Sequence, residues 1–202
     1  MSHYVKFTYQ RARAEIAPLD ALAELNDSNG VGFGNLSVRD SASRNFYITG
    51  SATGGLSEWT PRDCVRVVAY DFARNWLRYE GAAIPSSESL THAAIYESDQ
   101  STSAVIHCHD SVLWRTLLGR APTTSKSVAY GTPKMAYEIM RLFEISNVRS
   151  KKIFVMAGHE AGIVTFEKNL ERAFDVMMRE RELPQPCNAG EQYARAPSQP
   201  AE

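Results

Sequence analysis

Two histidines separated by a single residue are the first sign of chemistry in this sequence. His107 and His109 end the apolar run AVIHCH, and a polar ring is costly to bury without a partner. Side chains alternate between the two faces of a strand, so both imidazoles are predicted to point to one face and Cys108 to the other. The two positions would lie about 7 Å apart along the strand, which lets both rings reach one metal ion. Two satisfied polar residues at a strand end are the simpler interpretation of the pair alone.

A third ligand is needed for a catalytic metal, which takes about three protein ligands and one open position. The remaining histidines are His3, His92 and His159. His3 lies close to the chain start. His159 lies in AGHEAG, between two apolar stretches, and residues of such loops often carry function. It is therefore the natural third ligand, although a surface histidine in a turn is the simpler interpretation of this residue by itself.

Glu88 and His92 are the next candidates, because four residues separate them on a predicted helix. This spacing places both side chains on one helix face, and the helix dipole favours a carboxylate near the first turn. One helix could thus present a carboxylate and an imidazole to the same cleft. A solvated glutamate beside a histidine that packs the helix explains the same spacing.

Three short segments have the chemistry of anion sites. Gly34 and Asn35 in GFGNLSVR tolerate a positive φ and could form a nest of backbone N–H groups. Ser86 and Ser87 precede a predicted helix, whose N-terminus attracts phosphate. The GSATGG loop at 50–55 adds small hydroxyls and amides. With no Walker pattern in the sequence, these segments favour a small phosphate or carboxylate over a nucleotide.

These residues must be positioned by a mixture of helices and hairpin-joined strands. Helical spacing predicts helices over residues 8–25, 86–98, 111–119, 133–143 and 169–182, and a helix start at 60–63. Short apolar or alternating runs predict strands over residues 35–40, 44–49, 65–72, 75–81, 103–109, 126–130, 151–158 and 162–166. This pattern predicts one α/β domain over residues 1–183 with a largely antiparallel sheet, followed by a disordered tail over 184–202.

Composition excludes several classes of function. The net charge is −1 and no basic stripe stands out, so we expect no nucleic-acid partner. No apolar run approaches the roughly 18 residues of a membrane span, and the N-terminus lacks a secretory signal. The three cysteines are widely spaced without a CxxC pair. A reducing, cytoplasmic location is the simplest expectation.

Five stretches taken together resemble the class II aldolase and adducin family: GNLSVR, YITGSATGGLSE, PSSESLTHAAIY, AVIHCH and HEAG. The resemblance runs from about Thr8 to Met178. The family includes fuculose-phosphate and rhamnulose-phosphate aldolases, ribulose-phosphate epimerase and methylthioribulose-phosphate dehydratase. It implies a three-layer αβα sandwich around a mainly antiparallel central sheet, assembled as a cyclic homotetramer with sites between subunits.

The resemblance also implies a cofactor and roles for individual residues. One divalent metal per chain, usually Zn²⁺, would be bound by His107, His109 and His159, and Glu88 would act as the acid or base. The positions that match phosphate-contacting residues of the family are Asn35, Ser86, Ser87 and Ser51, the last with Thr53 and Gly54 as alternatives.

The implied activity is that of a lyase, which cleaves a ketose phosphate reversibly through a metal-stabilised enediolate. Decarboxylation, dehydration or epimerisation of a related sugar phosphate would use the same metal site. A non-catalytic module like the adducin head is a further alternative. That head lacks the metal histidines, so their presence here argues against it.

Departures from the family pattern fall around the predicted metal site. The aldolases have a longer segment after the histidine pair, which carries a tyrosine acid. Here the segment is short and its interior has no tyrosine, so Tyr130, or Tyr193 in the tail, is left as the substitute. Asp110 stands where many relatives have proline. Glu160 adds a carboxylate to the late turn, where a solvated side chain is the simpler interpretation.

Overall fold

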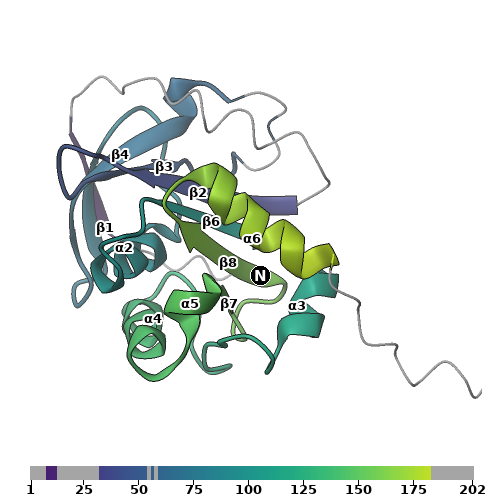
Figure 1. Cartoon of the computed structure of the whole chain (residues 1–202). Coiled ribbons are helices and arrows are strands. Elements are labelled where there is room, and N and C mark those ends of the chain that lie inside the picture. The colour runs from purple at the N-terminus through teal and green to yellow at the C-terminus, as the bar shows by residue number, and fades with distance from the viewer. Residues whose placement is uncertain (1–7, 13–31, 54–55, 57–58, 183–202) are drawn as a thin grey trace, which may run out of the picture.

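The computed structural model describes residues 8–12, 32–53, 56 and 59–182 (Figure 1). Eight strands form one sheet in the order β1-β5-β4-β3-β2-β6-β8-β7. The strands are β1 (Thr8–Ala12), β2 (Gly32–Arg39), β3 (Phe46–Thr49), β4 (Cys64–Asp71), β5 (Trp76–Glu80), β6 (Ala104–His109), β7 (Ile153–Val155) and β8 (Gly162–Glu167). The helices are α2 (Ser89–Ser98), α3 (Ser111–Leu117), α4 (Pro133–Ile145), α5 (Val148–Lys151) and α6 (Leu170–Glu182), with a 3-10 turn η2 (Pro61–Asp63).

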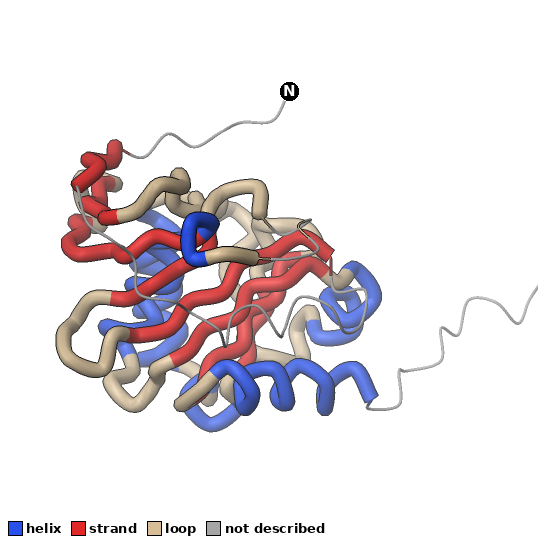
Figure 2. Tube along the Cα trace, turned by 90° about the horizontal axis from the view of Figure 1, so that it is seen from above, coloured by secondary structure: helices blue, strands red, loops and turns tan. Residues whose placement is uncertain are grey.

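Helices cover both faces of the sheet, which gives the three layers expected from the sequence (Figure 2). On one face, Tyr96 of α2 packs against Phe46 of β3, and Phe143 of α4 packs against Phe166 of β8, each with ring centroids 5.2 Å apart. On the other face, α3 and α6 pack against β6, β7 and β8, with Cys108 among the buried residues of that core. The predicted αβα fold class is therefore confirmed.

The sheet is mainly antiparallel, also as predicted. The hairpins β2–β3, β4–β5 and β7–β8 fall where alternating runs with short connections predict them. Strand β6 lies between β2 and β8 and is antiparallel to both. The one parallel pairing among the described strands joins β1 to β5. Strand β6, which carries the histidine pair, is thus held on both sides.

Close contact between β2 and β6 depends on Gly34. A Cβ atom built on Gly34 would lie 2.0 Å from the carbonyl oxygen of His107, so any side chain there would push the strands apart. The β2–β6 register shifts between Gly32 and Asn35, and Gly34 does not have a positive φ. The predicted nest at Gly34 and Asn35 is therefore wrong. The glycine serves the approach of two backbones.

Several predicted elements differ from the structure. Thr8–Ala12 is a strand paired with β5 rather than the start of a helix, because sheet pairing outweighs weak local helix propensity; the rest of the predicted helix, 13–25, lies outside the described residues. No strand forms over 126–130. The predicted helix start at 60–63 is one 3-10 turn, and α5 was not predicted. The tail at 184–202 also lies outside the described residues.

No helix in the described part of the chain has both the length and the apolar character needed to cross a membrane.

Candidate metal centre

Three imidazoles converge at the end of β6. The Nε2 atoms of His107 and His109 lie 3.1 Å apart. The ring of His159 has its centroid 5.1 Å from that of His107 and 4.5 Å from that of His109. One ligand atom from each residue can be chosen so that all three lie within 4.8 Å of one another. The structure thus brings together the three histidines that the sequence singled out.

Strand alternation separates the histidine pair from the cysteine between them. Cys108 packs against α6 on the opposite face of the sheet, with its Sγ 3.1 Å from the Sδ of Met177. Burial raises the pKa of the Cys108 thiol to about 12. The cysteine therefore stays a thiol in the core and takes no part in the imidazole cluster.

The turn between β7 and β8 places His159 beside the pair. Its backbone N–H donates to the carbonyl of Met156 at 3.1 Å, and its own carbonyl accepts from Gly162 at 2.9 Å. Ala161 closes the turn with φ at 64°. Gly162 is paired with His109 in the sheet, and a Cβ there would lie 3.3 Å from the ring of His107. The turn thus lies directly beside the end of β6.

The cluster favours neutral imidazoles. Burial lowers the pKa of His107 well below its usual value, and neighbouring His159 and His109 lower it further. Burial also lowers the pKa of His109, and it lowers that of His159 to about 4. Neutral imidazole is the form that binds a metal, so at neutral pH all three rings are ready to act as ligands.

A buried carboxylate completes the cluster. Glu88 is 2% exposed, and its Oε1 lies 3.6 Å from the Nδ1 of His159. Burial raises the pKa of Glu88 to about 7, and a contact with the Thr91 hydroxyl partly opposes the shift. No described residue makes a hydrogen bond of standard geometry to either Glu88 oxygen or to His159 Nδ1. Buried polar atoms rarely lack partners, so this donor set fits a bound cation.

His92 takes the packing role rather than the ligand role. Its ring is fully buried, and its Nδ1 lies 2.6 Å from the Oγ of Ser37, which in turn lies 2.7 Å from the hydroxyl of Tyr96. Glu88 is the N-cap residue of α2, so the carboxylate extends from the helix start while His92 packs within the helix. Of the two interpretations of the pair, the structure favours the second for His92.

The predicted phosphate-binding residues lie in adjoining segments. Asn35 is paired with His107 in the sheet, and its buried Oδ1 has no hydrogen-bond partner among the described residues. The loop with exposed Ser51 runs beside the segment before α2 through the Gly50–Pro85 bridge. Ser86 and Ser87 follow, and Ser86 Oγ accepts the Glu88 N–H at 3.2 Å. The serines precede the N-cap instead of forming it.

Two acidic residues near the histidines have separate places. Asp110 caps α3 by accepting from the backbone N–H groups of Val112 and Leu113. It also lies 3.1 Å from the guanidinium of Arg181 on α6, a contact between distant segments that the sequence did not indicate. Glu160 is exposed in its turn, as the simpler interpretation predicted.

One neighbour of the cluster was missed as such by the sequence analysis. The ring of Tyr130 stacks on that of His159, with centroids 4.1 Å apart and planes 19° apart. The sequence singled out Tyr130 only as a substitute acid in a predicted strand. Ring stacking between residues 29 positions apart leaves no local pattern.

Comparison with known proteins agrees with this geometry. The profile of the family described as "Class II Aldolase and Adducin N-terminal domain" matches residues 14–183. Among solved structures, an L-fuculose 1-phosphate aldolase is 25% identical, with a TM-score of 0.56 over 80% of this chain and 76% of its own. A putative aldolase/epimerase/decarboxylase from Escherichia coli, YgbL, is 20% identical, with a TM-score of 0.56 over 78% of this chain and 79% of its own.

A sugar-phosphate aldolase from Thermotoga maritima shares the fold at 15% identity, with a TM-score of 0.57 over 76% of this chain and 83% of its own. The search of curated proteins finds no match.

Proposed function

Because the chain belongs to the class II aldolase and adducin family, we propose that it is a metal-dependent lyase that cleaves a sugar phosphate by a reversible aldol reaction. The observation that carries the proposal is the cluster of His107, His109 and His159 with the buried carboxylate of Glu88 against it. The similarity to an L-fuculose 1-phosphate aldolase supports the reaction class.

The three histidines would hold one divalent metal ion. An all-imidazole set suits zinc among the common divalent metals, and zinc is the ion we propose. When bound, the ion supplies Lewis-acid polarisation of a substrate carbonyl. Three neutral ligands leave the double positive charge of the ion undiminished, which favours that polarisation over a site with a carboxylate ligand.

Glu88 is proposed to move the proton. A general acid or base must reach the reacting atom at hydrogen-bond distance, and Glu88 reaches the cluster through its 3.6 Å contact with His159. Its raised pKa of about 7 makes it able both to accept and to return a proton near neutral pH. The buried position keeps bulk water away from the carboxylate.

The substrate's phosphate is proposed to bind at Asn35, Ser51, Ser86 and Ser87. The loop after β3 and the segment before α2 lie side by side, and Asn35 lies on the strand next to His107. A phosphate held there would leave the sugar carbonyl extending toward the histidines. We further propose a homotetramer and a cytoplasmic location, as the family resemblance and composition predict.

A decarboxylase, dehydratase or epimerase is the second candidate. It is favoured by the short segment between His109 and Tyr130, which lacks the tyrosine acid of the aldolases. These reactions share the metal site and differ in the acids around the substrate. The alternative of a non-catalytic module is disfavoured, because the histidines and Glu88 form one cluster.

Two measurements test the proposal. Metal analysis of protein purified without chelator should find about one divalent ion per chain, and less than roughly one tenth of an ion would exclude both enzyme candidates. A screen of ketose phosphates, with unphosphorylated 2-keto acids beside them, should then show release of an aldehyde. Product formation without aldehyde release would favour the second candidate.

A further inference from the structure

The segment from Pro122 to Thr132, which we call the strap, packs along the turn that carries His159. The N–H of Val155 donates to Pro122, and the N–H of Thr124 donates back to Val155, both at 2.9 Å. The Thr124 Oγ1 then accepts from the N–H of Ala157 at 3.1 Å. Hydrogen bonds thus join the strap to the chain just before the turn.

The backbone of the strap is also in close contact with the turn between β7 and β8. A Cβ atom on Gly158 would lie 2.1 Å from the carbonyl oxygen of Val128, so the two backbones touch where a side chain would not fit. Gly158 immediately precedes His159. The position of this histidine therefore depends on the strap as well as on β7 and β8.

Helix α4 holds the strap in place. Thr132 caps the helix by accepting from the N–H of Met135, and its hydroxyl donates to the carbonyl of Ala129 at 2.7 Å. Further back, the N–H of Ser125 donates to Glu138 at 2.7 Å. The strap is thus fixed at both ends, with Tyr130 between the two attachments.

Because the strap is attached to α4, Tyr130 can hold the imidazole of His159 in a fixed orientation. Its ring stacks on the ring of His159, with centroids 4.1 Å apart and planes 19° apart. The rings of His107 and His109 lie farther from that imidazole and are inclined to its plane by 31° and 78°. The lone pair of an imidazole nitrogen lies in the plane of the ring, so the plane decides where a ligand bond can form. A stacked partner fixes that plane and leaves the nitrogens free.

We infer that Tyr130 is a positioning residue, whose ring holds the plane of His159 for the metal and so raises metal affinity. The inference rests on the metal site proposed above. It assigns the effect to the aromatic face rather than to the phenol hydroxyl. Partners that orient metal ligands typically contribute 10–100-fold in metal affinity, and for a stacking contact we expect a value near the lower end, about 10-fold.

The test compares Zn²⁺ affinity, measured by chelator competition on metal-free full-length protein, across variants at this position. Y130F keeps the ring and should bind Zn²⁺ as tightly as the wild type. Y130L removes the ring and should bind about 10-fold more weakly. Y137L, at a half-exposed tyrosine of α4, is the matched control and should leave affinity unchanged. If Y130L does not fold, Y130M fills the space without a ring and has the same expected loss.

A Co²⁺ spectrum provides the second readout. The visible bands of the Co²⁺ protein report ligand geometry, and they should shift in Y130L but not in Y130F or Y137L. Equal affinity and equal spectra in Y130L and wild type would overturn the inference, as would a loss in Y130F as large as that in Y130L. Absence of metal binding in the wild type would overturn it too. Metal binding without lyase activity would contradict only the proposed reaction.

Discussion

At the residue scale, the candidate metal ligands were predictable from the small number of histidines and from strand alternation. Few histidines occur in the chain, and strand geometry alone put His107 and His109 on one face and Cys108 on the other. Contacts between distant residues had no such signal. The approach of Glu88 to His159 and the stacking of Tyr130 depend on how α2 and the strap pack against the turn.

Replacing Glu88 by glutamine should separate proton transfer from metal binding. The amide keeps the shape of the side chain but cannot accept a proton, so E88Q should retain the metal and lose about 10²–10⁴-fold in kcat. Metal analysis and steady-state kinetics on the best substrate check both parts. Turnover equal to that of wild type would remove Glu88 from the mechanism.

Removing either His107 or His109 should release the metal, but the two substitutions should differ in how far they lower the stability of the metal-free protein. His109 is partly exposed at the strand end, whereas His107 is only 2% exposed inside the sheet. H109A should lose stoichiometric metal with little change in the stability of the metal-free protein. H107A should lose the metal and also about 1–3 kcal/mol of stability in that form, because it leaves a cavity. Chelator competition and denaturant unfolding of metal-free samples measure the two effects, and retained metal in H109A would contradict the ligand set.

At the element scale, the hairpins were predictable and the irregular segments were not. Alternating residues with a short turn determine a hairpin locally, which is why β2–β3 and β4–β5 were found. The run at 126–130 has strand-like residues but lies in the strap, which pairs with no strand there. Thr8–Ala12 pairs with β5, which lies more than 60 residues later in the sequence. Pairing over such a distance cannot be predicted from the local pattern of residues.

Among the contacts between strands, the close approach at Gly34 is the one where a single substitution should have the clearest effect on stability. In G34A the new methyl group would meet the His107 carbonyl, so β2 and β6 must separate next to the histidines. We expect a loss of more than about 2 kcal/mol in the free energy of unfolding and weaker metal binding. Urea unfolding and chelator competition measure both.

G119A is the matched control for that substitution. A Cβ at Gly119 meets nothing within 4 Å, although its φ of +73° disfavours a side chain. Its cost should be about 1 kcal/mol, with metal affinity unchanged. A loss in G34A no larger than that in G119A would show that β2 can move away from β6 freely.

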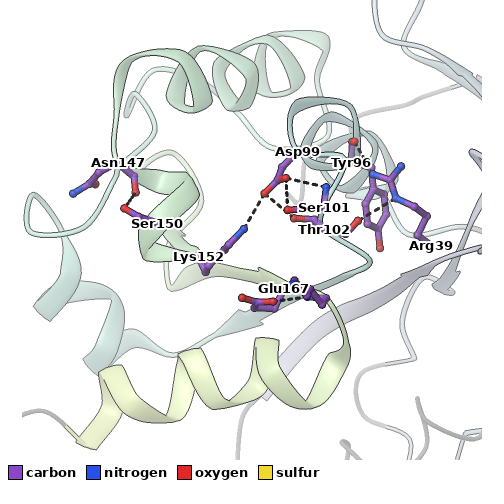
Figure 3. A network of polar contacts seen from close by, with 10 residues as sticks. Arg39, Tyr96, Asp99, Ser101, Thr102, Asn147, Ser150, Lys152 and Glu167 are labelled. Carbon is purple, nitrogen blue, oxygen red and sulfur yellow. Dashed lines mark hydrogen bonds and ion pairs between the residues drawn. The ribbon is translucent and has the colours of Figure 1, made fainter.

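At the scale of the whole molecule, polar contacts tie layers that lie far apart in the sequence. Asp99, just after α2, accepts hydrogen bonds from the hydroxyls of Ser101 and Thr102. It also pairs with the ammonium of Lys152, just before β7, with Nζ 2.9 Å from Oδ2 (Figure 3). On the same side, the Arg39 guanidinium of β2 donates to the Tyr96 carbonyl of α2. These contacts link the helical layer to β2 and to the start of β7 in the sheet.

Acid should lower the free energy of unfolding partly by protonating the Asp99 carboxylate. Burial alone would raise the pKa of Asp99, but Ser101 and Lys152 outweigh it and hold the pKa at about 2, below the usual 3.8. The carboxylate therefore contributes stability above pH 3.8 that is lost as the pH falls toward 2. After allowance for solvent screening this contribution is about 1–2 kcal/mol.

The variant D99N tests the link. Its stability deficit relative to wild type should be largest near neutral pH and should shrink below pH 3.8. Denaturant unfolding at a series of pH values follows this difference. E144Q, at an exposed position of α4, is the control and should show no such trend, and a D99N deficit that is constant with pH would contradict the assignment.

The alternation along β6 has one more consequence, for folding fidelity. A slip of β6 by one residue against its neighbours would turn Cys108 toward the cluster and drive the rings of His107 and His109 into the core against α6. In that register the three imidazoles could not meet. An ion that binds all three stabilises only the native register, by an amount that grows with the concentration of free metal. The availability of metal during folding would thus favour the native register of β6 over the shifted one.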